Sequence, residues 1–202
     1  MTSTHTPTST STPTPTPAPS LDAERTDLLA ALARARSALL TTVSGLSDEQ
    51  AGQQPTVSAL CLGGLIKHVA SIEEGWLRFV VEGPAAMPYD LPDGVTWDDL
   101  AAGTARVYPQ WAIDHQNDFR MLPGETLAAI VARYEDVAAR SAETIASVPD
   151  LSATHPLPEA PWHEQGAVRS VRGVLMHVIA ETAQHAGHAD ILREALDDRK
   201  AG

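Results

Sequence analysis

Apolar residues recur at helical spacing in four long segments of the chain, which clusters of Pro and Gly separate. The first segment runs from about residue 20 to residue 46, with Leu28, Leu32, Leu39, Val43 and Leu46 on one stripe. Residues three, four or seven positions apart share one face of an α-helix. Ser20 is the predicted N-cap, followed by Asp22 and Glu24 in the first turn, where the helix dipole favours anions. A capping-box pattern over residues 47–50 marks its end.

The other three segments have the same amphipathic character. The second runs from about residue 58 to 81, with Leu62, Leu65, Val69, Ile72, Trp76 and Val80 on one face, and the Gly83-Pro84 pair stops it. The third covers residues 125–148, with Leu127, Ile130, Tyr134, Val137 and Ile145 pointing inward. The fourth covers residues 170–196. Because no segment alternates like a strand, we predict an all-α fold, a four-helix bundle.

The longest interruption of the pattern covers residues 84–123 and carries several Pro and Gly turn signals. A short helix is expected near Trp97–Val107, and Asp114, His115 and Asp118 are expected in a solvated loop. A connection of this length is usually functional or mobile.

The first 20 residues differ from the rest in composition. Thr, Ser and Pro make up 17 of them, and none is Lys, Arg, Asp or Glu. Such a segment has no apolar surface to offset its ordering entropy, so it is predicted to be a disordered tail. It lacks the basic start and apolar stretch of a signal peptide. Residues 21–202 are therefore expected to form the folded domain.

Charge and cysteine content narrow the function classes. With 14 Lys+Arg against 26 Asp+Glu, the net charge is −12. This argues against nucleic acid and anionic membranes as partners. No run of about 18 apolar residues is present. A single cysteine indicates a reducing compartment, so we expect a cytoplasmic protein. The expected partner is a small molecule, bound by a monomer or a homodimer.

Polar side chains enter the apolar face of the fourth predicted helix. That face comprises Val174, Val178, Ala189, Leu192 and Leu196. At about 100° per residue, His185 falls inside this arc and Glu181 lies about 40° from His185. His177 and His188 lie on the same flank as Glu181. Burying these groups without partners would cost several kcal/mol, so a metal ion or a hydrogen-bonded Glu–His network must satisfy them.

The second predicted helix supplies one more ligand type. His68 lies about 40° from Ile72, at the margin of the apolar face, and about as far into its helix as Glu181 and His185 are into theirs. Helix bundles build metal sites from such inward-pointing groups. Imidazole and carboxylate suit Zn²⁺, Ni²⁺ or Fe²⁺. Spacing alone leaves open whether Glu181 and His185 or His185 and His188 form the binding pair.

Two stretches resemble the DinB/YfiT-like superfamily of metal-binding four-helix bundles. They are Leu65-Ile-Lys-His68-Val-Ala-Ser-Ile-Glu73-Glu-Gly-Trp76 and Leu175-Met-His177-Val-Ile-Ala-Glu181-Thr-Ala-Gln-His185-Ala-Gly-His188. The chain is most similar to actinobacterial members and to mycothiol-dependent maleylpyruvate isomerase-like proteins. The resemblance implies an up-down-down-up bundle in which residues 84–123 form the crossover. It also implies a divalent metal, zinc before nickel or iron, held by His68, Glu181 and His185.

The resemblance further implies roles for the neighbouring residues. His188 is expected beside the ligands or as a proton shuttle, and His177 as an interior hydrogen-bonding residue. Independently of the resemblance, Arg172 and Trp76 are candidates for substrate binding. Arg193 is another candidate, for an anionic substrate. Cys61 is expected to be a small buried residue, since no basic neighbour would activate its thiol.

The implied activity is the metal-dependent transfer or addition of a low-molecular-weight thiol, mycothiol, to a small electrophile. The metal would lower the pKa of the thiol, so that thiolate exists near neutral pH. Two alternatives remain. The first is a hydrolase that uses metal-bound water, and the second is a non-catalytic metal-binding stress protein.

Overall fold

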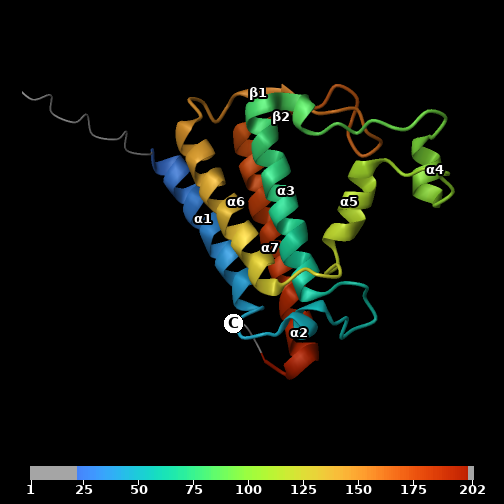
Figure 1. The fold of residues 1–202 in the computed structure, drawn as a ribbon. Coiled ribbons are helices and arrows are strands. Elements are labelled where there is room, and N and C mark those ends of the chain that lie inside the picture. The colour runs from blue at the N-terminus through green and yellow to red at the C-terminus, as the bar shows by residue number, and fades with distance from the viewer. Residues whose placement is uncertain (1–21, 200–202) are drawn as a thin grey trace, which may run out of the picture.

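Four long helices form the bundle that the periodicity predicts (Figure 1). A computed structural model describes residues 22–199 of the chain. The helices are α1 (Ala23–Thr41), α3 (Leu62–Glu82), α6 (Leu127–Ser147) and α7 (Val171–Asp197). No helix within the described residues combines the length and the apolar character needed to cross a membrane.

The predicted starts of two helices need correction or qualification. Ser20 lies outside the described residues, and Asp22 acts as the N-cap of α1 by accepting a hydrogen bond from the backbone of Arg25. Helix α3 begins at Leu62 instead of near residue 58. Cys61 precedes it with an extended backbone, and its Sγ accepts a hydrogen bond from the backbone N–H of Gly64 at 3.3 Å. A cap at Cys61 fixes the first turn there.

Contacts at the helix ends establish the up-down-down-up topology. Arg172 near the start of α7 pairs with Glu24 near the start of α1, so these two helices are parallel. Arg140 of α6 pairs with Glu74 of α3 at 2.7 Å, and Lys67 of α3 pairs with Glu125 just before α6 at 2.8 Å. Helices α3 and α6 are therefore also parallel. Parallel neighbours require the predicted crossover, which spans residues 83–126.

The crossover and the last connection contain more regular structure than predicted. Shorter elements are α2 (Asp48–Gly52), η1 (Gly83–Ala86), α4 (Trp97–Ala102), α5 (Gln110–Asp118), β1 (Thr154–Pro156) and β2 (Val168–Ser170). The expected solvated loop at residues 114–118 is thus a helix. Its polar sequence shows no apolar stripe, because only a few of its side chains touch the bundle. Strands β1 and β2 pair antiparallel over three residues each, too short for a detectable alternation.

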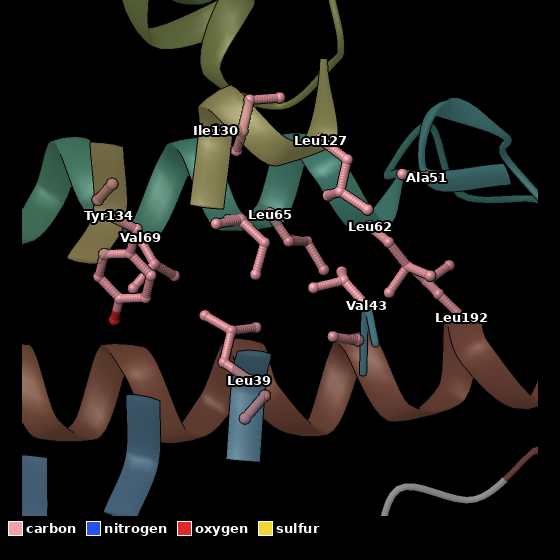
Figure 2. Packing of buried hydrophobic residues seen from close by; sticks show 14 of the residues in the cluster. Leu39, Val43, Ala51, Leu62, Leu65, Val69, Leu127, Ile130, Tyr134 and Leu192 are labelled. Carbon is pink, nitrogen blue, oxygen red and sulfur yellow. The ribbon is translucent and has the colours of Figure 1, made fainter. Parts of the chain in front are cut away.

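The apolar face of each long helix points into the interior, where the buried apolar residues form two clusters. Figure 2 shows one half of this core, where side chains from all four long helices meet: Leu39, Val43, Leu62, Leu65, Val69, Leu127, Ile130, Tyr134 and Leu192. On α7 the predicted stripe is buried at Val174, Val178, Ala189 and Leu192, and partly buried at Leu196. All residues of α3 from Leu62 to Ala70 are buried, and His68 is among them.

One buried ion pair joins α1 to α3 across the bundle. The guanidinium of Arg36 binds both carboxylate oxygens of Glu73, whose side chain is 0% exposed. Burial and the nearby Glu73 carboxylate raise the pKa of the Tyr134 hydroxyl above its ordinary value. Removing one partner would leave a buried charge, so this pair holds α1 and α3 in one register.

The first turn of α3 packs directly on the crossover. A Cβ at Gly64 would lie 2.2 Å from the carbonyl oxygen of Phe119, so only glycine allows this approach. A Cβ at Gly187, in the middle of α7, would meet no atom within 4 Å.

These two glycines give a matched pair of substitutions. We expect Gly64→Ala to lower the free energy of unfolding by about 1–3 kcal/mol, because the rigid backbone at Phe119 must move away. Gly187→Ala should raise it by about 0.5–1 kcal/mol, because alanine is the better helix former. Urea unfolding followed by circular dichroism measures both. Equal effects of the two substitutions would contradict the close packing of α3 on the crossover.

Candidate metal centre and adjoining cleft

Helices α3 and α7 bring three predicted ligands together in the bundle. His68 lies in the middle of α3, and Glu181 and His185 are one turn apart on the antiparallel α7. Glu181 Oε1 lies 3.6 Å from His68 Nε2 and 3.3 Å from His185 Nε2. One ligand atom from each residue lies within 4.8 Å of the others. These three residues could therefore hold one metal ion.

The donor atoms of this triad fit a divalent ion better than they fit one another. Zn–N and Zn–O bonds of about 2.0–2.2 Å place two ligands of a tetrahedral ion about 3.4 Å apart. The separations across Glu181 match that value. His68 is only 3% exposed, and its Nδ1 has no hydrogen-bond partner among residues 22–199. The other nitrogen, Nε2, lies just beyond hydrogen-bond distance of Glu181, so a metal ion at Nε2 would give this buried ring a partner.

The surroundings keep the two imidazoles neutral, which is the form that binds metals. Burial lowers the pKa of His68 to about 4, and the nearby His185 and His115 act in the same direction, while Glu181 opposes them. Burial also lowers the pKa of His185, with a smaller contribution from His188 and an opposing one from Glu181. A proton is thus disfavoured where a metal ion would bind.

His188 and His177 lie on either side of the ligand pair along α7. His188 Nδ1 and His185 Nδ1 are 3.4 Å apart, so one nitrogen donates and the other accepts. Because His188 is the partner of His185 Nδ1, Nε2 of His185 is free to face Glu181. Residues that hydrogen-bond to the second nitrogen of a metal-binding histidine commonly orient its ring in this way. His177 instead packs edge-on against Trp76, with ring centroids 5.0 Å apart. Burial and then Arg169 lower the pKa of His177.

The crossover covers the other side of His68. The ring of Phe119 stacks on His68 at 4.1 Å, and the ring of His115 meets His68 edge-on at 5.5 Å. Sequence reasoning assigned His115 to a loop and did not select Phe119. Phe119 directly follows α5, four residues after His115, so the two side chains lie on one side of the helix. This spacing was the only sequence signal for their shared contact with α3, because apolar periodicity is absent there.

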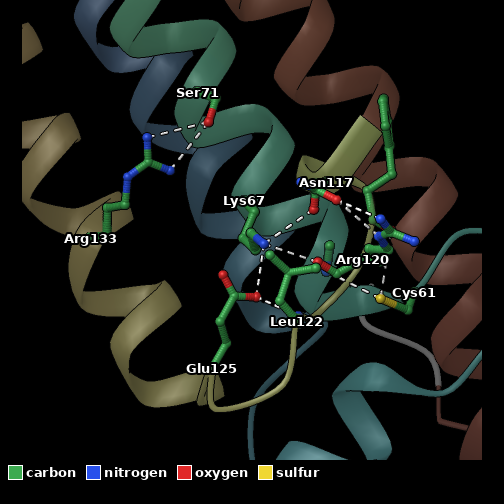
Figure 3. Close-up of polar contacts among 10 residues, drawn as sticks. Cys61, Lys67, Ser71, Asn117, Arg120, Leu122, Glu125 and Arg133 are labelled. Atoms are coloured by element: carbon green, nitrogen blue, oxygen red, sulfur yellow. Dashed lines mark hydrogen bonds and ion pairs between the residues drawn. The ribbon is translucent and has the colours of Figure 1, made fainter. Parts of the chain in front are cut away.

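A buried lysine fastens this cover to α3 (Figure 3). Lys67 is 8% exposed, and its Nζ donates hydrogen bonds to the carbonyl oxygens of Asn117 and Arg120 and to the carboxylate of Glu125. Glu125 also accepts a hydrogen bond from the backbone of Leu122 at 2.6 Å. A cation at the C-terminal carbonyls of α5 complements the helix dipole. Lys67 thereby holds α5, and with it His115 and Phe119, against the site.

Two other sequence predictions concern residues at the edges of the site. Cys61 is buried, as predicted, and its Sγ lies 3.8 Å from the carbonyl oxygen of Phe119 as a hydrogen-bond partner. Trp76 is 7% exposed, and the guanidinium of Arg169 lies 4.6 Å from the centroid of its ring. Trp76 therefore packs between Arg169 and His177. His177 precedes Glu181 by one turn of α7.

The arginines proposed to meet an anionic substrate are engaged elsewhere. Arg172 pairs with Glu24, and it precedes Glu181 by nine residues, about 13 Å along the helix axis. Arg193 donates to the carbonyl oxygens of Thr42 and Ser44 and pairs with Asp197. The structure does not bring Arg172 to the triad.

A cleft of about 1340 Å³ lies between α3, α5 and α6. Its apolar lining includes Ile72 of α3 and the rings of Tyr89, Trp111 and Trp162. His68, Glu181 and His185 do not line this cleft themselves, but His115 lines it and its ring also contacts that of His68.

Comparison with known families identifies the family of the chain. A family model described as mycothiol S-transferase matches residues 27–198, from the second turn of α1 to the end of α7. The matched region contains His68, Glu181 and His185. A search of curated proteins finds no match for the chain.

Metal content tests the ligand set directly. We expect the wild type to bind one equivalent of a divalent ion. His68→Ala and Glu181→Gln should weaken metal binding at least about 10-fold, since even outer partners of ligands contribute about 10–100-fold. His163→Ala is the control, because the ring of His163 bonds the carbonyl oxygen of Pro158 instead. Elemental analysis after dialysis that finds full metal content in both ligand variants would refute the assignment.

Acid should destabilise the metal-free protein through His68. The folded-state pKa of about 4 lies below the unfolded-state value of about 6.5, so the unfolded chain binds more protons between these two values. The free energy of unfolding should therefore fall by about 1–3 kcal/mol from pH 7 to pH 4. His68→Gln should remove much of this slope in urea unfolding of chelator-treated protein. An unchanged slope in that variant would contradict the buried neutral imidazole.

Proposed function

Because the chain belongs to the mycothiol S-transferase family, we propose that it joins the thiol of mycothiol to an electrophilic carbon of a small substrate. The reaction takes place beside His68, Glu181 and His185. The observation that carries this proposal is the family match across the same residues that form the buried group of donors.

The proposed cofactor is one divalent metal ion, zinc before nickel or iron. Two imidazoles and one carboxylate suit these ions, and three protein ligands are typical of catalytic sites that keep a position open. When bound, such an ion supplies the Lewis acidity that lowers the pKa of a coordinated thiol, so that thiolate exists at neutral pH.

The side chains of this protein orient the ligands and exclude water. His188, at hydrogen-bond distance from His185, holds the His185 ring in its orientation. The same half-buried imidazole is our candidate for carrying the thiol proton toward solvent, since an imidazole can both accept and donate a proton. Phe119 stacks on His68 and keeps water from that side of the site. Trp76 is proposed to form a wall against which the thiol lies.

The family match favours thiol transfer over the two alternatives that the sequence leaves open. In a hydrolase, water would take the place of the thiol as nucleophile, and the product would contain no sulfur. In a metal-binding stress protein, no product would form. The three functions therefore differ in a product that mass spectrometry identifies.

The decisive experiment incubates metal-loaded protein with mycothiol and a panel of electrophiles. We expect a mycothiol conjugate whose rate of formation falls at least about 100-fold in Glu181→Gln, as the loss of a ligand should exceed the effect of an outer partner. Glu194→Gln makes the same change at an exposed position more than three turns further along α7, so it should retain the wild-type rate. Chelation should stop the reaction and added metal should restore it.

Either of two outcomes would overturn the proposal. One is that folded, metal-loaded wild type forms no conjugate with any electrophile. The other is that Glu181→Gln forms the conjugate at the wild-type rate. A sulfur-free product that depends on Glu181 would identify the hydrolase instead.

A further inference from the structure

Three aromatic rings from separate segments form one wall of the cleft beside the candidate metal centre. Tyr89 precedes α4, Trp111 belongs to α5, and Trp162 lies between β1 and β2. The ring centroids of Trp111 and Trp162 each lie 5.3 Å from that of Tyr89. Trp111 Nε1 donates to the carbonyl oxygen of Asp90 at 3.0 Å. Trp162 remains 56% exposed, so the wall is open to an entering ligand.

The cations that line the cleft are already paired. Lys67 pairs with Glu125, Arg78 with Glu82, and Arg133 with Glu74. An anionic ligand would have to displace one of these carboxylates. The cleft therefore offers no free positive charge among the described residues that line it.

Two carboxylates of the cleft lack such a partner. Asp114 and Asp118 of α5 line the cleft, and neither forms an ion pair within the described part of the chain. Asp114 accepts a hydrogen bond only from Gln110, its neighbour one turn earlier. Burial raises the pKa of Asp118, although Ser71, Arg133 and Lys67 act in the opposite direction.

These observations define the ligand that the cleft would favour. Aromatic faces attract cations, and the attraction is strongest for organic ammonium groups that shed water easily. A positive group placed between the aromatic wall and α5 would also pair with Asp114 and Asp118. A neutral ligand would remove water from both carboxylates without replacing it, which costs free energy. The net charge of −12 attracts cations to the molecule as a whole.

We propose that this cleft binds the electrophilic substrate and selects one that carries a positively charged amine or quaternary ammonium group. Asp114 and Asp118 hold the cation against Tyr89, Trp111 and Trp162. The electrophilic carbon then extends past His115 toward His68. This assignment rests on the proposed thiol transfer and adds to it the class of electrophile.

Binding of an unreactive probe tests the cleft without any turnover. Phenyltrimethylammonium is the cationic probe, tert-butylbenzene is its neutral counterpart of equal shape, and benzenesulfonate is the anionic one. We expect the cationic probe to quench tryptophan fluorescence with an affinity at least about 10-fold higher than the other two. The double substitution Asp114→Asn and Asp118→Asn should remove this preference.

A matched control separates local pairing from overall charge. Asp98→Asn combined with Asp93→Asn removes the same two charges from exposed positions of the crossover that do not line the cleft. This control should keep the preference for the cationic probe. The proposal would be overturned if the wild type bound the three probes with equal affinity. It would also be overturned if both double variants lost the preference for the cationic probe to the same extent.

Turnover separates failure of the inference from failure of the proposed function. Three chloroacetamides of similar size carry a trimethylammonium, a tert-butyl or a sulfonate group. In each, a C–S bond forms to mycothiol, the C–Cl bond breaks, chloride leaves with the bonding electron pair, and the thiol proton passes to water. We expect kcat/KM at least about 10-fold higher for the cationic compound. Conjugation of all three at equal kcat/KM would support thiol transfer and refute the selection of cations.

Discussion

Burial of the His68 imidazole opposite the Glu181 carboxylate is the constraint on which the site depends. Helix α3 is buried along its whole first half, so His68 cannot reach bulk water. The low pKa of His68 prevents it from acting as a cation for Glu181 near neutral pH. The carboxylate and the two neutral rings therefore face one another without a positive charge among them. A divalent ion would supply the missing positive charge.

The contact between α3 and α5 lies between the candidate metal centre and the cleft, since His115 contacts His68 and also lines the cleft. Lys67 and His68 are adjacent on α3 but contact different helices. His68 faces α7, and Lys67 binds the end of α5. Through Lys67, the crossover that the parallel α3 and α6 require becomes the cover of the site. Gly64 permits this contact because its missing Cβ leaves space for the carbonyl oxygen of Phe119. The connection imposed by topology thus supplies the wall that a substrate would meet.

Much of the fold was predictable, because a helix buried on one face repeats its apolar residues with a fixed period. The same geometry placed His68, Glu181 and His185 at one level of neighbouring helices. Helix α5 was not predictable in this way, since its sequence is polar and its stability comes from contacts such as that of Lys67. The pair of Arg36 and Glu73 was also missed, because charged residues on a helix are usually exposed. The cleft escaped detection because its lining comes from segments far apart in the sequence.

A metal ion that accepts a thiol from outside the chain is central to the proposed function. Cys61 is the only cysteine, and it is buried at the start of α3, where its sulfur caps the helix. The most direct measurement is X-ray absorption at the zinc edge of the metal-loaded protein, before and after addition of mycothiol. The proposed function predicts only nitrogen and oxygen neighbours of the zinc at first, and one sulfur neighbour at about 2.3 Å once mycothiol is added. A sulfur neighbour before addition, or none afterwards, would contradict it.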